Sequence, residues 1–221
     1  MARTQAVLLD LDGTLLDTAP DLADAANAML AGLGLKPLAA GVVRGFIGRG
    51  IPYLVERCLA EAGLPLACAQ LEPALRSFGD HYRAFNGRSS RPFPGVLEGL
   101  EHMRQAGLKL ACITNKAQAF TMPLLAACGV ASLLDAVVTA DQVGRRKPDP
   151  AICLHACRQL QVGPGDAVVI GDSANDAESG RAAGCRVVLV TYGYGEGRDV
   201  RELGADGVVD SFAAAVKWAA A

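Results

Sequence analysis

Two carboxylates stand two positions apart at the end of an apolar run near the start of the chain. The run, residues 6–9, is followed by Asp10 and Asp12. The first carboxylate could attack phosphorus or carbon as a nucleophile, which divides one difficult step into two through a covalent intermediate. The second could give a proton to the leaving oxygen and later take one from water. The pair therefore indicates nucleophilic and acid–base catalysis.

The same segment could instead begin a calcium-binding loop or form a surface turn. An EF-hand loop requires a preceding helix, a glycine at its sixth position and a glutamate at its twelfth. Here an apolar strand precedes the carboxylates, and Leu15 and Asp21 occupy those two positions. Gly13 and Thr14 suit a sharp turn directly after the strand. The catalytic interpretation is therefore favoured.

Two later segments carry groups that could bind a phosphate. Thr114 and Asn115 follow an apolar run and offer a hydroxyl and an amide, although such a pair also commonly caps a helix. Lys147 precedes a proline and is a compact positive charge suited to an anion. Alone it could equally be a solvated lysine beside its two arginine neighbours.

A further pair of carboxylates, Asp172 and Asp176, follows another apolar run. Together with Asp10, Asp172 would form an oxygen-rich site for a hard cation such as Mg²⁺, whereas no histidine cluster offers the softer site that suits zinc. Charge repulsion explains why the reaction would need a cation. A carboxylate 4 Å from a phosphate dianion is repelled by roughly 8 kcal/mol at an effective dielectric near 20, or about six orders of magnitude in rate. A divalent cation and Lys147 would offset this repulsion.

The elements that must position these groups alternate between strands and helices over most of the chain. Such alternation predicts βαβ units, a parallel sheet covered on both faces and ligand binding at the carboxyl ends of its strands. The expected fold class is α/β, with a Rossmann-like parallel-sheet core. Apolar runs predict strands at residues 6–9, 108–113, 136–138, 167–170, 186–190 and 208–209.

One interval, residues 16–90, shows helical periodicity only. We expect it to be an inserted helical cap domain that closes over the site, with residues 1–15 and 91–221 forming the core domain. Thr18 followed by Asp21, with Pro20 near the helix start, predicts that Thr18 caps the first helix of the insertion.

Composition limits the partners. The 221 residues are 51% hydrophobic and 20% charged, with a net charge of −2 and interleaved signs. Neither a basic face for nucleic acid nor a polybasic membrane patch is present, so a small molecule is the expected partner. No apolar run approaches the roughly 18 residues needed to span a bilayer, and we expect a cytoplasmic protein, monomer or homodimer. The seven cysteines have no metal-binding spacing and are interpreted as small, reduced core residues.

Taken in order, four motifs resemble those of the haloacid dehalogenase-like superfamily across the whole chain. The resemblance implies that Asp10 is the nucleophile and Asp12 the general acid and base. It implies that Thr114, Asn115 and Lys147 bind the phosphoryl group. Asp10, Asp12 and Asp172 would hold Mg²⁺, with Asp176 supporting them. The motifs are Asp10-x-Asp12-Gly-Thr, Thr114-Asn115, Lys147-Pro and Gly171-Asp172-x-x-x-Asp176.

The sequence departs from the patterns of two other branches of this superfamily, which narrows the range of expected reactions. Asp12 argues against dehalogenases, which lack this acid, and Lys36 stands beside a proline turn, unlike the Schiff-base lysine of phosphonate hydrolases. Three segments resemble bacterial phosphoglycolate phosphatases, which implies hydrolysis of a small phosphorylated substrate, 2-phosphoglycolate. They are residues 17–21, 48–57 and 191–195.

Alternatives stay open at this point. The substrate could be a sugar phosphate or an amino-sugar acid phosphate, the enzyme could be a phosphosugar mutase, or the chain could be a non-catalytic binding module. Arg49 stands between two glycines where that branch would have asparagine. It could bind a substrate carboxylate and set specificity, or merely occupy a cap turn.

Overall fold

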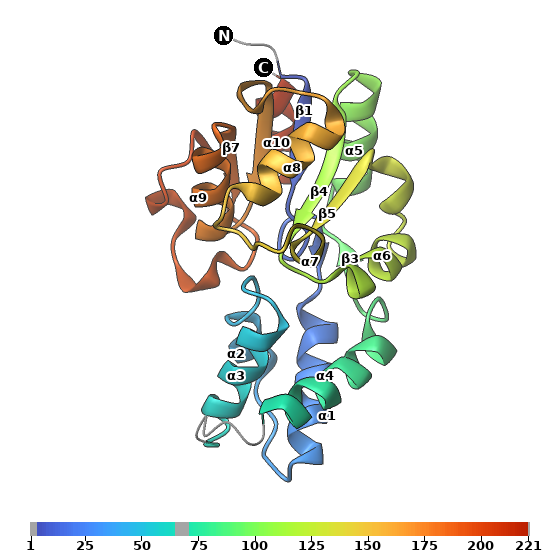
Figure 1. Ribbon diagram of the computed structural model, residues 1–221, viewed down its shortest axis with the longest axis vertical. Coiled ribbons are helices and arrows are strands. Elements are labelled where there is room, and N and C mark those ends of the chain that lie inside the picture. The colour runs from blue at the N-terminus through green and yellow to red at the C-terminus, as the bar shows by residue number, and fades with distance from the viewer. Residues whose placement is uncertain (1–3, 65–70, 221) are drawn as a thin grey trace.

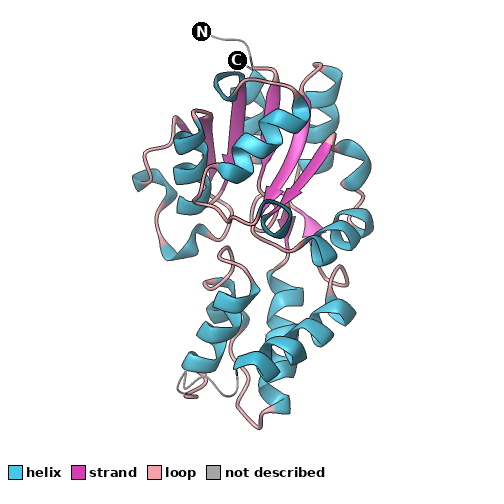
Figure 2. Ribbon diagram, viewed as in Figure 1, coloured by secondary structure: helices cyan, strands magenta, loops and turns pink. Residues whose placement is uncertain are grey.

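The structure, a computed structural model, describes residues 4–64 and 71–220, and a six-stranded parallel sheet forms its centre (Figures 1 and 2). The strands are β1 (Ala6–Leu9), β4 (Lys109–Thr114), β5 (Ala136–Thr139), β6 (Ala167–Gly171), β7 (Arg186–Val190) and β8 (Gly207–Val209). Their order across the sheet is β5-β4-β1-β6-β7-β8, with β1 near the middle. In register, Ala6 pairs with Lys109 on one side and with Ala167 on the other. The predicted parallel α/β fold is confirmed.

Apolar side chains cover both faces of the sheet, as the continuous apolar runs require. In β1, Ala6 and Leu8 point into one core, whereas Val7 and Leu9 point into the core on the opposite face. All four side chains are fully buried. Burial on both faces leaves the ends of β1 as its only route to solvent and ligands.

Helices form a layer on each face of this sheet (Figure 2). One face is covered by α8 (Ala151–Leu160) and α9 (Ala174–Ala183). The other is covered by α5 (Val96–Gln105), α6 (Gln118–Ala127) and α10 (Phe212–Ala220). The shorter elements are α7 (Ala140–Val143) and the 3₁₀ turns Ala131–Leu133, Pro164–Asp166, Gly195–Gly197 and Val200–Glu202. Among the helices of the described ranges, none is both long and apolar enough to cross a membrane.

Four helices between β1 and β4 lie apart from the sheet and share their own core (Figure 1). They are α1 (Ala19–Gly32), α2 (Ala40–Arg44), α3 (Ile51–Glu61) and α4 (Leu71–Phe85). We call this group the cap. Buried side chains such as Met29, Val55 and Phe78 fill its core, in line with the helical periodicity of the sequence.

The connections between cap and core pair with each other as two short antiparallel strands. These are β2 (Leu16–Asp17) and β3 (Arg91–Pro92), with Leu16 opposite Pro92. This ribbon has no counterpart among the predicted strands, because two residues are too few for a periodic signal. The ribbon lies beside the proposed boundaries at 15/16 and 90/91, although the division into domains itself stays a prediction.

The predicted side-chain cap of the first cap helix is wrong. Helix α1 does begin after Thr18 and has a proline in its first turn, but the Thr18 side chain makes no capping hydrogen bond. Its hydroxyl donates to Asp12 at 2.6 Å instead, and the amides of Thr18 and Ala19 donate to the hydroxyl of Tyr194 at 2.7 and 2.9 Å. A distant tyrosine therefore accepts the hydrogen bonds that open the helix.

The six described cysteines are free, and five of them are buried. This agrees with their interpretation as small core residues; Cys68 lies outside the described residues. The free thiols are Cys58, Cys112, Cys128, Cys153, Cys157 and Cys185.

Candidate active site

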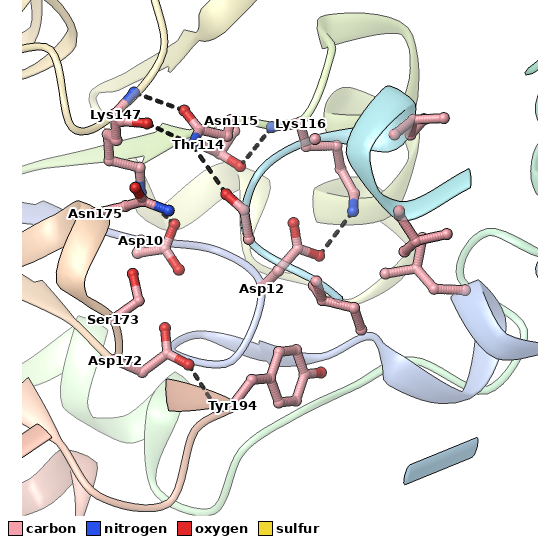
Figure 3. A pocket seen from close by; sticks show the side chains of 16 residues that line it. Asp10, Asp12, Thr114, Asn115, Lys116, Lys147, Asp172, Ser173, Asn175 and Tyr194 are labelled. Atoms are coloured by element: carbon pink, nitrogen blue, oxygen red, sulfur yellow. Dashed lines mark hydrogen bonds and ion pairs between the residues drawn. The ribbon is translucent and has the colours of Figure 1, made fainter. Parts of the chain in front are cut away.

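Polar side chains from the carboxyl ends of β1, β4 and β6 meet in one pocket, which the cap closes from the other side (Figure 3). This is the edge of a parallel sheet at which ligands bind. The core contributes the charged groups, whereas four aliphatic side chains come from the cap. The lining residues are Asp10, Asp12, Leu22, Ile47, Gly48, Gly50, Ile51, Leu54, Thr114, Asn115, Lys116, Lys147, Asp172, Ser173, Asn175 and Tyr194.

Lys147 connects the predicted nucleophile to Asp176 in the first turn of α9. Its ammonium donates to Asp10 Oδ1 at 2.5 Å, to Asp176 Oδ1 at 2.7 Å and to the Ile113 carbonyl at 3.0 Å. Burial alone would lower the pKa of Lys147, but the charges of Asp10 and Asp176 raise it. Burial raises the pKa of Asp10 well above its ordinary value, although Lys147 acts against this. Lys147 is thus a buried cation held beside the reacting carboxylate.

Asp176 is a structural anchor for this end of β6. Its second oxygen accepts from the hydroxyl of Ser173 at 2.6 Å and from the amides of Asp172 and Ser173 at 3.3 and 3.2 Å. A carboxylate in the first turn of α9 is also favoured by the helix dipole. Both oxygens of Asp176 are therefore already used by protein donors.

Asp172 is held mainly by backbone. Its Oδ2 accepts from the amides of Tyr194 and Gly195 at 2.6 and 3.4 Å, and its Oδ1 accepts from Thr14 at 3.3 Å. Burial, followed by the charge of Asp176, raises the pKa of Asp172 to about 7. A Cβ at Gly13 would collide with the Asp172 carboxylate, and the φ of +96° at Gly13 favours glycine as well.

The carboxylates of this edge fit a hard cation. Oxygen atoms of Asp10, Asp172 and Asp176 all lie within 4.8 Å of one another, and all three residues are buried. One lysine accompanies these three acids, so the cluster is short of positive charge. Short hydrogen bonds from Lys147 and Ser173, at 2.7 and 2.6 Å, occupy both oxygens of Asp176, whereas Oδ1 of Asp172 receives only a long one from Thr14, at 3.3 Å. Asp10 and Asp172 are therefore the carboxylates best able to bind a cation. An all-oxygen donor set of this kind suits Mg²⁺.

Asp12 points away from these three acids (Figure 3). Its Oδ1 accepts from Lys116 at 2.7 Å and from Thr18 at 2.6 Å. The Lys116 ammonium nitrogen lies over the Tyr82 ring, 5.3 Å from its centre. Burial alone would lower the pKa of Lys116, but the charge of Asp12 raises it. A role of Asp12 in holding the metal therefore stays a prediction.

Lys116 is the charged residue that the sequence analysis missed. It is 6% exposed and lines the pocket. The signal was present in the run Thr114-Asn115-Lys116, but only the first two residues were assigned a role. Ser173 and Asn175 were also missed, although they stand in the Gly171–Asp176 motif.

The two predicted phosphate-binding residues of this run differ in their contacts. The Thr114 hydroxyl oxygen accepts from the Lys116 amide at 3.1 Å, so its own hydrogen can still be donated to a phosphate oxygen. The Asn115 side chain instead donates to the Gly48 and Lys147 carbonyls at 2.9 and 3.1 Å and accepts from the Lys147 amide at 2.8 Å. It joins the cap loop to the Lys147 segment, and its direct contact with phosphate stays a prediction.

Arg49 lies in the same cap loop but is not among the residues that line the pocket. Its side chain is exposed, with the guanidinium 5.2 Å from the centre of the Tyr53 ring. A role in substrate specificity therefore stays a prediction. After β7, Tyr194 lines the pocket, and Arg44 of the cap donates to the carbonyl of its neighbour Gly193 at 2.8 Å.

The parallel sheet, the helical insertion and the carboxylate–lysine cluster at the strand ends together define a class of α/β hydrolases. The model of the haloacid dehalogenase-like hydrolases matches residues 4–184. The chain belongs to this family.

Curated relatives and a solved structure match nearly the whole chain. A phosphoglycolate phosphatase from Nitrosospira multiformis is 47% identical, covering 96% of this chain and 94% of its own length. A plasmid-encoded phosphoglycolate phosphatase from Cupriavidus necator is 48% identical, covering 95% and 90%. The crystal structure of a predicted phosphoglycolate phosphatase from Haemophilus somnus has a TM-score of 0.92, 31% identity and 99% coverage of both chains.

Proposed function

We propose that this protein is a Mg²⁺-dependent phosphomonoesterase that hydrolyses 2-phosphoglycolate to glycolate and phosphate. The observation that carries the proposal is Asp10, buried at a strand end between Lys147 and the carboxylate of Asp172, with the acid Asp12 on its other side. The names of the similar phosphatases support the choice of substrate. Hydrolysis of a phosphate ester through a covalent intermediate uses a nucleophile, an acid and a buried cation.

Binding of the phosphate group uses groups that are already in place. The Thr114 hydroxyl and the Lys147 ammonium lie in the pocket around Asp10 and would neutralise the phosphate oxygens. Asp10 and Asp172 would hold Mg²⁺, which supplies positive charge that lowers the repulsion between the carboxylate and the phosphate. Because these groups are buried, their effect on the developing charge is stronger than in water.

The reaction then follows two displacements at phosphorus. An oxygen of Asp10 attacks phosphorus and forms an aspartyl phosphate, while the bond from phosphorus to the glycolate oxygen breaks. Asp12 gives its proton to that oxygen as glycolate leaves. Water then attacks the same phosphorus and transfers a proton to Asp12, which releases phosphate and restores the Asp10 carboxylate.

The cap side of the pocket supports a small substrate over a sugar phosphate. Its lining side chains are aliphatic, from Leu22, Ile47, Ile51 and Leu54. A sugar carries several hydroxyls, and a pocket that recognises them presents polar partners. The single methylene of 2-phosphoglycolate needs no such partner.

Phosphate release in the presence of Mg²⁺ tests this proposal. The enzyme is expected to show a higher kcat/KM for 2-phosphoglycolate than for a panel of sugar phosphates and amino-sugar acid phosphates, without any bisphosphate activator. A clear preference for a sugar phosphate would refute the substrate, a requirement for a bisphosphate would indicate a mutase, and background rates throughout would favour a binding module.

The nucleophile is tested by Asp10→Asn, which should abolish turnover with the fold retained. Asp24→Asn, an exposed carboxylate on α1, is the matched control and should keep full activity. Turnover retained in Asp10→Asn would contradict the mechanism. The cytoplasmic location and the monomer or homodimer state stay predictions from the sequence.

A further inference from the structure

Two buried lysines line the pocket, and their ammonium groups are used very differently. Lys147 has three acceptors, Asp10, Asp176 and the Ile113 carbonyl, which matches its three N–H donors. The ammonium of Lys116 has a single acceptor within hydrogen-bond distance among the residues that the structure describes, Oδ1 of Asp12. Lys116 therefore has donors to spare inside the pocket.

The other polar neighbour of the Lys116 ammonium in the described ranges is Tyr82, which helps to raise the pKa of the lysine; even with both Asp12 and Tyr82 as partners, one of the three N–H donors of Lys116 stays unused. The centre of the Tyr82 ring lies 5.3 Å from the ammonium nitrogen, and the face of an aromatic ring attracts a cation without using up an N–H donor. The hydroxyl of Tyr82 is buried and, within the described part of the chain, makes no hydrogen bond. Asp12 pairs with the charge of Lys116, but each buried N–H donor that has no acceptor still costs free energy. The ligand that enters the pocket can supply that acceptor.

The position of Lys116 beside Asp12 identifies which part of the ligand it meets. Asp12 must reach the ester oxygen that leaves phosphorus, because it protonates that oxygen. In 2-phosphoglycolate a single methylene separates this oxygen from the carboxylate. With Lys116 only 2.7 Å from Asp12, the substrate carboxylate falls next to the one pocket lysine that has donors left.

We propose that Lys116 is the specificity-determining residue that binds the carboxylate of the substrate and selects short phosphorylated acids over neutral phosphate esters. The inference rests on the proposed function and deepens it. It assigns recognition of the substrate carboxylate to Lys116 of the core instead of Arg49 of the cap. Arg49 is exposed and lies outside the pocket lining, and Arg44 donates to the Gly193 carbonyl, whereas Lys116 is 6% exposed and faces the reacting groups.

A matched pair of substrates tests this assignment. Ethyl phosphate has the two carbons of 2-phosphoglycolate but no carboxylate. The ratio of their kcat/KM values cancels any effect of a variant on Asp12, because both substrates need the same acid. We expect Lys116→Gln, which keeps a donor for Asp12 but removes the charge, to lower this ratio about 10- to 100-fold, mainly through KM for 2-phosphoglycolate.

Two further variants control the experiment. Lys116→Arg keeps the charge and should retain most of the ratio, whereas Lys36→Gln removes an exposed cap lysine and should leave it unchanged. A ratio that stays at the wild-type value in Lys116→Gln, with both substrates slowed equally, would overturn the proposal and leave Lys116 as a positioning residue for Asp12.

Failure of this inference can be told apart from failure of the proposed function. A wild-type enzyme that prefers 2-phosphoglycolate while Lys116→Gln keeps the ratio refutes the role of Lys116 alone. A wild-type enzyme that hydrolyses other esters but not 2-phosphoglycolate refutes the proposed function. Should the Lys116 variants fail to fold, inhibition of the wild type decides: glycolate must inhibit ethyl phosphate hydrolysis more strongly than neutral glycolamide, and equal inhibition overturns the proposal.

Discussion

The carboxylate of Asp21 accepts a hydrogen bond of 2.6 Å from the hydroxyl of Ser90, so the first cap helix is fixed to the segment that returns the chain to the core. The same carboxylate accepts from the amides of Gly87, Ser89 and Ser90 at 2.8, 2.8 and 3.1 Å. Asp21 is fully buried. Together with the β2–β3 ribbon, it holds the two connections of the cap side by side.

Replacement of this carboxylate by an amide should loosen the base of the cap. Asp21→Asn puts an NH₂ group opposite backbone donors, and we expect a loss of about 1–3 kcal/mol in the free energy of unfolding. Urea unfolding measures this, and hydrogen exchange should rise at residues 87–90. Asp24→Asn on the exposed side of α1 should change stability by less than about 0.5 kcal/mol. Equal stability of the two variants would show that Asp21 is not an anchor.

The sheet and most of the site could be predicted because their signals are local. Apolar runs that end in Asp10, Thr114 or Asp172 identify a buried strand and its functional end in the same few residues. The order of the strands in the sheet then brings these ends together. The family motifs placed Lys147 beside them, although its proline-rich turn has no periodic signal of its own.

Interactions across long sequence separations could not be predicted in this way. Thr18 and Asp21 have the spacing of a helix start, but their side chains bond to Asp12 and to the return segment instead. The hydroxyl of Tyr194, 176 residues from Thr18 in the sequence, accepts a backbone hydrogen bond at the start of α1. Tertiary contacts thus overrode a local capping preference, and only the folded chain shows which partner is closer.

The hydroxyl of Tyr194 should stabilise the folded protein by binding the start of the cap to the core. It accepts from the amides of Thr18 and Ala19 and donates to Asp17 at 2.8 Å, so Tyr194→Phe leaves these groups without their partner. We expect a loss of about 1–3 kcal/mol in the free energy of unfolding, measured with urea. Tyr53→Phe, on the cap helix α3, should cost less. A Tyr194→Phe protein as stable as the wild type would contradict this role.

Removal of the Lys147 charge should destabilise the protein as well as inactivate it. Lys147→Met leaves Asp10 and Asp176 as buried carboxylates without a cation, with an expected cost of about 3–5 kcal/mol. The double variant Lys147→Met/Asp176→Asn removes one of those charges and should recover part of the stability but no activity. Lys109→Met, at the opposite end of β4, is the control and should keep activity. A fully active Lys147→Met enzyme would refute the charge argument.

Mg²⁺ should stabilise the folded protein through Asp172. A ligand at about 100 times its Kd that binds only the folded state adds about 2.7 kcal/mol to the free energy of unfolding, which urea titrations with Mg²⁺ and with EDTA can measure. Asp172→Asn should lose most of this gain, since it removes a carboxylate from the cluster with Asp10 and Asp176. In EDTA the same variant should be at least as stable as the wild type, because fewer like charges are buried together. Asp24→Asn should keep the full response to Mg²⁺, and an undiminished response in Asp172→Asn would place the cation elsewhere.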